Sequence, residues 1–159
     1  MRVSIGIGQR IAKVSVLIRA IFFLGLEKIH RVTSLQRFEL YIYVVAVNGS
    51  TYNARYDDFK ISDEDSGYKL SLGKFSGTIK EDAMRNGENM KFTTFDRDND
   101  IDDGNNNCAV TYESGWWYTK CYNCNLNALY GPDLDWWLNN LKEAKMLIRP
   151  KRSDEEVST

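Results

Sequence analysis

The chain has 159 residues, of which 43% are hydrophobic and 13% aromatic, so it has enough apolar surface for one globular domain with a single core. Its charges nearly cancel, with 21 basic and 22 acidic residues. Because it has no broad basic field, we do not expect it to bind nucleic acid or an anionic membrane surface. No uninterrupted apolar stretch reaches the roughly 20 residues of a membrane span.

The first 20 residues differ in composition from the rest of the chain. They have a basic beginning and an apolar run, as a signal peptide would, but Arg19 interrupts this run and no A-x-A-like cleavage site follows. Turn chemistry and clean periodicity are absent from them. We therefore expect residues 1–20 to form a separate, non-domain segment, and we predict no clear signal peptide.

A helix and a hairpin are predicted next. Over residues 26–34, apolar residues recur at three- and four-residue spacing with charged residues between them, which predicts a short amphipathic helix. Residues 38–47 are rich in aromatic and β-branched side chains, and Asn48-Gly49 separates them from a second strand-like run over 51–61. This order predicts a β-hairpin that turns at Asn48-Gly49. Asn48-Gly49-Ser50 is also an N-glycosylation acceptor sequence in that turn.

Shorter elements follow. The patterns predict a strand over 68–75, a helical turn over 81–84 and a strand over 90–95. Beyond Gly104 the chain is mostly loop, and the acidic tail over 152–159 is predicted to be disordered.

An acidic loop spans residues 96–104, with carboxylates at alternate positions and a final glycine. Hard oxygen ligands at this density suit Ca²⁺, which takes six to eight oxygens. An EF-hand is excluded because the sixth position is Ile101 rather than glycine and the twelfth is Asn107 rather than glutamate. From the residues alone, a calcium site and a solvated acidic turn both remain open.

Three cysteines, Cys108, Cys121 and Cys124, lie close together and favour a local disulfide. A structural zinc site is disfavoured, because the single histidine, His30, is far away in sequence. In an oxidising compartment the odd count leaves one thiol, which is buried, reactive or paired between chains.

Tryptophan occurs as two adjacent pairs, Trp116-Trp117 and Trp136-Trp137. In a strand, neighbouring side chains point to opposite faces, so one ring of a pair fills the core while the other lines a surface or pocket. The alternative, with both rings in the core, is equally compatible with the sequence.

Three stretches carry a more specific pattern. The first is FLGLEKIH at 23–30 with Thr33-Ser34 and ELY at 39–41, and the second runs from ARYDDFKI at 54–61 to LGKFSG at 72–77. The third includes FDRDND at 95–100, NCA at 107–109, GWWY at 115–118, Cys121 and NLN at 125–127. In this order they resemble the fibrinogen C-terminal domain family, which includes ficolins, tachylectins and angiopoietin-like ligands.

The resemblance covers residues 21–151 and implies an α+β fold. It implies a central antiparallel sheet, short helices and a loop-rich subdomain that carries calcium and a ligand pocket. The family's N-terminal subdomain is missing from the matched stretch. This shortening fits either a diverged paralogue or a truncated, non-functional product.

The resemblance also implies a calcium site and a disulfide. Asp98 and Asp100 match side-chain ligands of Ca²⁺, and Asp102 and Gly104 match positions that give backbone carbonyls. Cys108 and Cys121 match the family's disulfide. Such a loop closure stabilises a fold by about 3 kcal/mol. Cys124 has no standard partner, so an oligomer through Cys124 or through missing upstream segments is one expectation.

The expected ligand pocket lies beside that disulfide. The resemblance places Tyr112, Tyr118, Lys120, Cys121 and Tyr122 around it, with a cis peptide between Lys120 and Cys121. Tyr122 stands where many members have histidine. In lectin-like members the pocket accepts acetyl groups on sugars.

Two functions therefore follow from the resemblance. The first is a secreted, calcium-binding, lectin-like module of innate immunity that binds acetylated glycans or microbial surfaces. The alternative is an extracellular signalling ligand of the angiopoietin-like kind that binds a cell-surface protein. An enzyme is not expected, because the chain has one histidine and no nucleophile-elbow or phosphate-loop motif.

Overall fold

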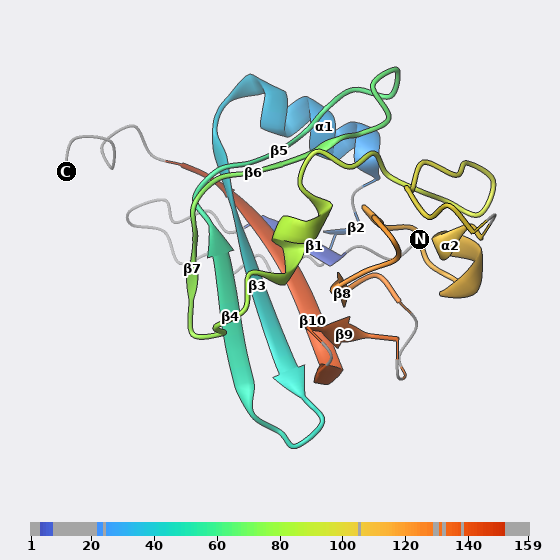
Figure 1. Cartoon of the computed structure of the whole chain (residues 1–159). Coiled ribbons are helices and arrows are strands. Elements are labelled where there is room, and N and C mark those ends of the chain that lie inside the picture. The colour runs from blue at the N-terminus through green and yellow to red at the C-terminus, as the bar shows by residue number, and fades with distance from the viewer. Residues whose placement is uncertain are drawn as a thin grey trace.

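A central antiparallel sheet dominates the computed structural model, which describes residues 4–7, 22–23, 25–104, 106–128, 131, 133–137 and 139–151. Its three main strands are β3 (Phe38–Ala46), β4 (Thr51–Tyr56) and the closing strand β10 (Asn139–Pro150), with β3 in the middle (Figure 1). The strands β3 and β4 form the hairpin predicted from Asn48-Gly49, and this prediction is confirmed.

Short strands extend the sheet on both sides. Strand β7 (Phe75–Gly77) pairs with β4, and β1 (Ser4–Ile7) pairs with β10 in parallel and with β2 (Phe22–Phe23). The sequence placed residues 1–20 outside the domain, whereas Ser4–Ile7 lie in the sheet. The physical reason is that β10 would otherwise be an open edge with unpaired backbone groups on that side. Residues 8–20 lie outside the described part.

Helix α1 (Leu26–Leu35) confirms the predicted amphipathic helix. It buries Ile29 and Thr33 and contacts β5 (Phe59–Ile61), where a ring nitrogen of His30 lies 3.0 Å from the Ile61 carbonyl oxygen. Strand β5 pairs with β6 (Leu70–Leu72) in a separate two-stranded sheet. The helix and this small sheet lie together at one end of the molecule (Figure 1).

The single strand predicted over 51–61 is in fact two strands, β4 and β5. The break falls at Asp57-Asp58, where the Asp57 carboxylate accepts the backbone N–H of Lys74 at 2.5 Å and the Asp58 carbonyl accepts that of Gly73 at 2.7 Å. A β-carbon on Gly73 would lie 2.3 Å from an Asp57 oxygen, so this close approach requires glycine.

The strand predicted over 90–95 does not form. In its place, Thr93 makes one isolated bridge to Trp116, and Thr94 bridges Arg97 in a tight turn. The predicted helical turn is the 3-10 helix η1 (Ala83–Gly87). The C-terminal part contains α2 (Cys108–Thr111), β8 (Cys124–Asn125) and β9 (Asp135–Trp136).

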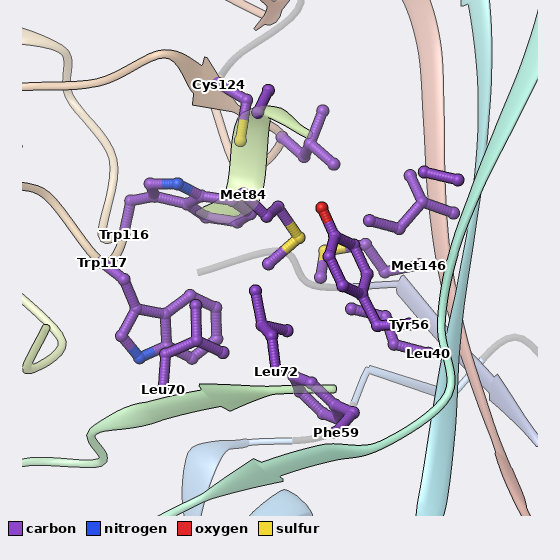
Figure 2. Close-up of a cluster of buried hydrophobic side chains, with 14 of the residues drawn as sticks. Leu40, Tyr56, Phe59, Leu70, Leu72, Met84, Trp116, Trp117, Cys124 and Met146 are labelled. Carbon is purple, nitrogen blue, oxygen red and sulfur yellow. The ribbon is translucent and has the colours of Figure 1, made fainter. Parts of the chain in front are cut away.

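The hydrophobic core lies between one face of the sheet and the loop-rich part. Leu40 and Tyr56 face η1 and the segment around residues 116–117 (Figure 2). Both rings of the first tryptophan pair are buried, at 3% and 4% exposure, while in the second pair Trp136 is buried and Trp137 is 43% exposed. The two pairs therefore follow the two different interpretations that the sequence left open. No helix among the described residues is long and apolar enough to span a bilayer.

Candidate calcium and ligand site

The acidic loop is organised by its own backbone. The Asp98 carboxylate accepts the backbone N–H of Asp100 at 3.2 Å, and the Asp100 carboxylate accepts that of Asp102 at 3.0 Å. These side-chain-to-backbone bonds are the local turns that Asp favours in loops. They set the path of the loop through residues 98–102 and place three aspartates along one short curve.

The loop is attached to the cysteine-linked segment at two points. The second oxygen of Asp100 accepts the backbone N–H of Cys108 at 2.9 Å, and Ile101 donates its backbone N–H to the Thr119 carbonyl at 3.1 Å. Cys108 and Cys121 form a disulfide with a Cα–Cα distance of 5.3 Å, which confirms the expected pairing. The acidic loop and the ring of residues 108–121 that the disulfide closes therefore form one connected unit.

The donor set fits a hard cation. Carboxylate oxygens keep lone pairs after accepting one N–H each, so Asp98 and Asp100 can still ligate Ca²⁺. Among the described residues, no lysine or arginine forms an ion pair with either side chain. In the described part of the chain these two carboxylates are therefore not neutralised by a basic side chain, which leaves them able to bind a cation.

A second group of metal-ligand type does not qualify. Asp102, Cys108 and Cys121 bring their ligand atoms within 4.8 Å of one another. Both sulfurs are consumed in the disulfide, and a disulfide sulfur is not a thiolate ligand. The calcium assignment therefore depends on Asp98, Asp100 and the backbone carbonyls of Asp102 and Gly104.

Asn107 connects the loop to the start of α2, and the sequence reading missed this role. Its side-chain oxygen accepts the N–H groups of Ala109 and Val110, and its nitrogen donates to the Thr94 carbonyl at 2.9 Å. An asparagine immediately before a helix is a preferred N-cap. Through these bonds Asn107 links the start of α2 to Thr94, just before the acidic loop.

Three tyrosines pack together, two of them within the disulfide-closed segment 108–121 and one directly after it. Tyr112 and Tyr122 make an edge-to-face contact with ring centroids 4.7 Å apart, and both are partly exposed. The ring centroid of Tyr118 lies 6.3 Å from the ring centroid of each of these two tyrosines. The structure thus brings together the three aromatic residues that the sequence placed at the pocket.

Tyr118 differs from the other two because it is 0% exposed. Its hydroxyl lies 2.6 Å from the Ser114 hydroxyl and accepts a hydrogen bond from the Asn125 amide at 3.1 Å. Burial raises the pKa of Tyr118 to about 12. Its ring lies next to the rings of Tyr112 and Tyr122, and its burial leaves no surface for a ligand.

The peptide segment at Cys121 departs from the expectation. No cis peptide occurs among the described residues, so the bond between Lys120 and Cys121 is trans. Cys121 takes a positive φ of 59° instead, and this left-handed residue turns the chain where a cis bond was expected. Thr119 donates its N–H to the Cys121 carbonyl at 3.0 Å, closing the turn.

The other residues that the resemblance assigned to a ligand pocket differ in accessibility. Lys120 is exposed, and its ammonium lies 3.3 Å from the Asp103 carboxylate. Burial raises the pKa of Tyr122 to about 12, and the Asp133 carboxylate adds to this shift. Cys121 lies in an isolated antiparallel bridge with Thr119, whereas the backbone N–H of Tyr122 has no hydrogen-bond partner among the described residues.

Cys124 does not suit the expected intermolecular bridge. It is the free cysteine, it is 1% exposed, and burial raises the pKa of its thiol well above the usual value. A buried neutral thiol is a poor nucleophile. The expectation of an oligomer through Cys124 is therefore wrong for the folded chain, because its sulfur lies in the core beside Trp116 and Met84 (Figure 2).

Comparisons with known proteins match this architecture. The family model for the C-terminal globular domain of fibrinogen beta and gamma chains matches residues 6–151. The human fibrinogen C domain-containing protein 1 is 35% identical over 150 residues, covering 83% of this chain and 32% of that protein. Tenascin-R of Gallus gallus is 42% identical over 110 residues, covering 69% of this chain and 8% of that protein.

Solved structures give the same result. The fibrinogen-like globe domain of human ANGPTL6 superposes with a TM-score of 0.75 at 32% identity, covering 82% of this chain and 64% of that one. A lamprey fibrin D-dimer complexed with the peptide Gly-His-Arg-Pro-amide gives a TM-score of 0.68 at 25% identity, covering 81% of this chain and 49% of that one. The chain thus spans less than two thirds of the length of each of these proteins.

The fold and the disulfide-linked loop unit define an α+β domain of the fibrinogen-like globe type. The chain belongs to the fibrinogen C-terminal domain family. Members of this family are typically extracellular binding modules.

Proposed function

We propose that this chain is a secreted, calcium-supported recognition module that binds acetylated glycans beside the disulfide of Cys108 and Cys121. One observation carries the proposal: the Asp100 carboxylate accepts the backbone N–H of Cys108 at 2.9 Å. The acidic loop is therefore attached to the disulfide-closed segment 108–121, which contains Tyr112 and is followed directly by Tyr122. A cation held by this loop would steady the recognition surface.

The chemistry of an acetyl group suits the surface around Cys121. Its methyl group would pack against the exposed faces of Tyr112 and Tyr122, since aromatic rings favour such apolar contacts. Its carbonyl oxygen would accept the backbone N–H of Tyr122, which has no partner in the described part of the chain. Lys120 lies at the exposed rim and would reach polar groups on the same sugar.

Calcium would neutralise the two loop carboxylates that lack a protein counter-ion. Asp98 and Asp100 would hold it with their side chains, and Asp102 and Gly104 with backbone carbonyls. The bound charge would stiffen a loop that contacts the ring through Ile101 and Thr119.

The test uses calorimetry on oxidised, full-length chain. We expect heat on addition of Ca²⁺, and then binding of N-acetylglucosamine but not of glucose, an uncharged sugar with a hydroxyl group in place of the acetamido group. Tyr112→Ala should weaken the sugar response at least tenfold while calcium binding is retained. Equal responses to the two sugars, or no response to either, would contradict the acetyl pocket.

A second candidate is a peptide or protein ligand, and a specific finding favours it. The lamprey fibrin D-dimer, a neighbour in fold, is complexed with the peptide Gly-His-Arg-Pro-amide. Titration of that peptide into the calcium-loaded chain is the discriminating measurement. Peptide binding that N-acetylglucosamine does not compete would assign the surface to protein recognition.

A further inference from the structure

We infer that Asn48 is the acceptor of one N-linked oligosaccharide when the chain passes through the secretory pathway. Asn48-Gly49-Ser50 is the single N-x-S/T triplet in the 159-residue sequence. A triplet alone is weak evidence, because many are buried or lie in regular strands. The structure supplies the local geometry that makes this one an acceptor.

The triplet lies at the tip of the hairpin formed by β3 and β4. Gly49 donates its N–H to the Ala46 carbonyl at 2.9 Å, and Ala46 donates its own to the Ser50 carbonyl at 2.8 Å. Gly49 has a φ of +87°, a conformation that glycine adopts without strain. Residues 47–49 are all exposed, so an enzyme can approach the turn from solvent.

The Asn48 side chain is held in an Asx turn. Its carbonyl oxygen accepts the backbone N–H of Ser50 at 2.9 Å. This bond leaves the amide nitrogen, Nδ2, as the group not engaged by the turn, and it has no partner among the described residues. The reacting nitrogen and the Ser50 hydroxyl therefore belong to one compact, exposed loop.

The transfer needs a lipid-pyrophosphate-linked oligosaccharide as donor. Nδ2 of Asn48 forms a bond to the anomeric carbon of the sugar, the bond from that carbon to the pyrophosphate oxygen breaks, and the lipid pyrophosphate leaves with the bonding electrons. The amide nitrogen gives up one proton. No oxidant or reductant is involved.

The position of the turn suits a glycan. The hairpin projects from the end of the sheet, away from the acidic loop and α2, so a bulky chain would leave the site beside Cys121 open (Figure 1). Val47 and Tyr52 flank the triplet and are 68% and 38% exposed. A hydrated oligosaccharide at Asn48 would cover these apolar side chains at the hairpin tip.

The experiment expresses the full chain behind a cleavable secretion signal in insect cells. We expect one discrete mobility step that peptide N-glycosidase removes, with peptide mass mapping showing conversion of Asn48 to aspartate. Asn48→Gln and Ser50→Ala should each abolish the step, whereas Ser50→Thr should retain it because threonine keeps the hydroxyl. Because the mobility step should be lost in both variants, the conclusion does not depend on the folding of either one alone.

An unmodified Asn48 in secreted, folded wild-type chain would overturn the inference. So would a mobility step that persists in both Asn48→Gln and Ser50→Ala. Calcium calorimetry before and after glycosidase treatment separates this result from the proposed function. The glycan is expected to leave the calcium response unchanged, and a missing calcium response with a glycosylated Asn48 would contradict only the recognition site.

Discussion

Asp100 bonds the backbone N–H of Cys108 with one carboxylate oxygen and that of Asp102 with the other, at 2.9 and 3.0 Å. A single side chain therefore spans from the acidic loop to the first cysteine of the disulfide. Charge-assisted bonds of this kind are stronger than those between neutral groups. An ion that binds Asp100 would therefore also help to fix the position of Cys108 and of the disulfide-closed segment 108–121.

Removal of the Asp100 charge should abolish most of the calcium response. Asp100→Asn keeps an acceptor oxygen for only one of the two backbone N–H groups, but the disulfide still closes the segment, so we expect the chain to fold. Loss of one anionic ligand should weaken Ca²⁺ binding by tenfold or more. Isothermal calorimetry gives the affinity. Asp103→Asn is the matched control, because Asp103 is exposed and pairs only with Lys120 in the described contacts. Equal calcium affinities for the two variants would rule out the assigned ligand set.

Loss of the disulfide should destabilise the chain and loosen the loop together. Cys108→Ala combined with Cys121→Ala opens a ring of 14 residues, 108 to 121. The loop-closure model gives about 3 kcal/mol for a ring of this size. Urea unfolding monitored by tryptophan fluorescence measures the loss of unfolding free energy.

Mass mapping provides the companion measurement to that unfolding experiment. The wild-type chain should contain one bridge, between Cys108 and Cys121, and one thiol at Cys124 that reacts only after unfolding. A Cys124 that reacts rapidly with a thiol reagent in the native chain would contradict its buried position.

The sequence predicts the elements that depend on residues close together in the chain, and it does not predict those that depend on residues far apart in the chain. The helix at 26–35 and the hairpin at 38–56 follow from apolar periodicity and an Asn-Gly turn, which are local signals. Strand β1 could not be predicted, because its pairing of Ile5 with Met146 joins the two ends of the chain. The strand predicted over 90–95 was wrong because it lacks a continuous partner, although its residues suit a strand.

In the candidate site too, some features follow from the sequence and others depend on contacts that the sequence does not reveal. The resemblance supplied the Cys108–Cys121 pairing and the acidic loop, and the pairing is confirmed. Burial of Tyr118 could not be read from the sequence, since it depends on Ser114 and Asn125 meeting its hydroxyl. The positive φ of Cys121 was also missed, because cysteine carries no local preference for that conformation.

Glu39 should be a major contributor to the stability of the sheet. Its side chain is 3% exposed and forms ion pairs with Arg55 of β4 and Arg149 of β10, so it links all three main strands. Removing one member of a buried ion pair costs about 3 kcal/mol or more, and we expect about 2 kcal/mol for Glu39→Ala because both arginines can still reach solvent. Chemical denaturation measures the change.

The control for Glu39 is Glu27→Ala. Glu27 also pairs with an arginine, Arg31, but both side chains are exposed, at 47% and 74%. Exposed helix pairs contribute little, so no measurable change in the unfolding midpoint is expected. A Glu39→Ala variant as stable as Glu27→Ala would show that the three-strand link is dispensable.

Alkaline pH should destabilise the chain through Tyr118. Burial raises the pKa of this phenol to about 12, whereas an unfolded tyrosine has a pKa of about 10. The folded state therefore holds the proton more tightly, so the stabilisation is complete below pH 10 and is lost as the pH rises from about 10 to about 12. The full loss for one such group is about 2 to 3 kcal/mol.

Urea midpoints between pH 9 and pH 12 test this dependence, with Tyr118→Phe as the informative variant. Without the phenol, the fall in unfolding free energy over that range should be shallower than in the wild-type chain. At neutral pH the same variant should be about 1 to 2 kcal/mol less stable, because the buried Ser114 hydroxyl and Asn125 amide lose a partner. Tyr52→Phe, at a position 38% exposed, is the control and should keep the wild-type profile. An unchanged alkaline slope in Tyr118→Phe would mean that another group governs the transition.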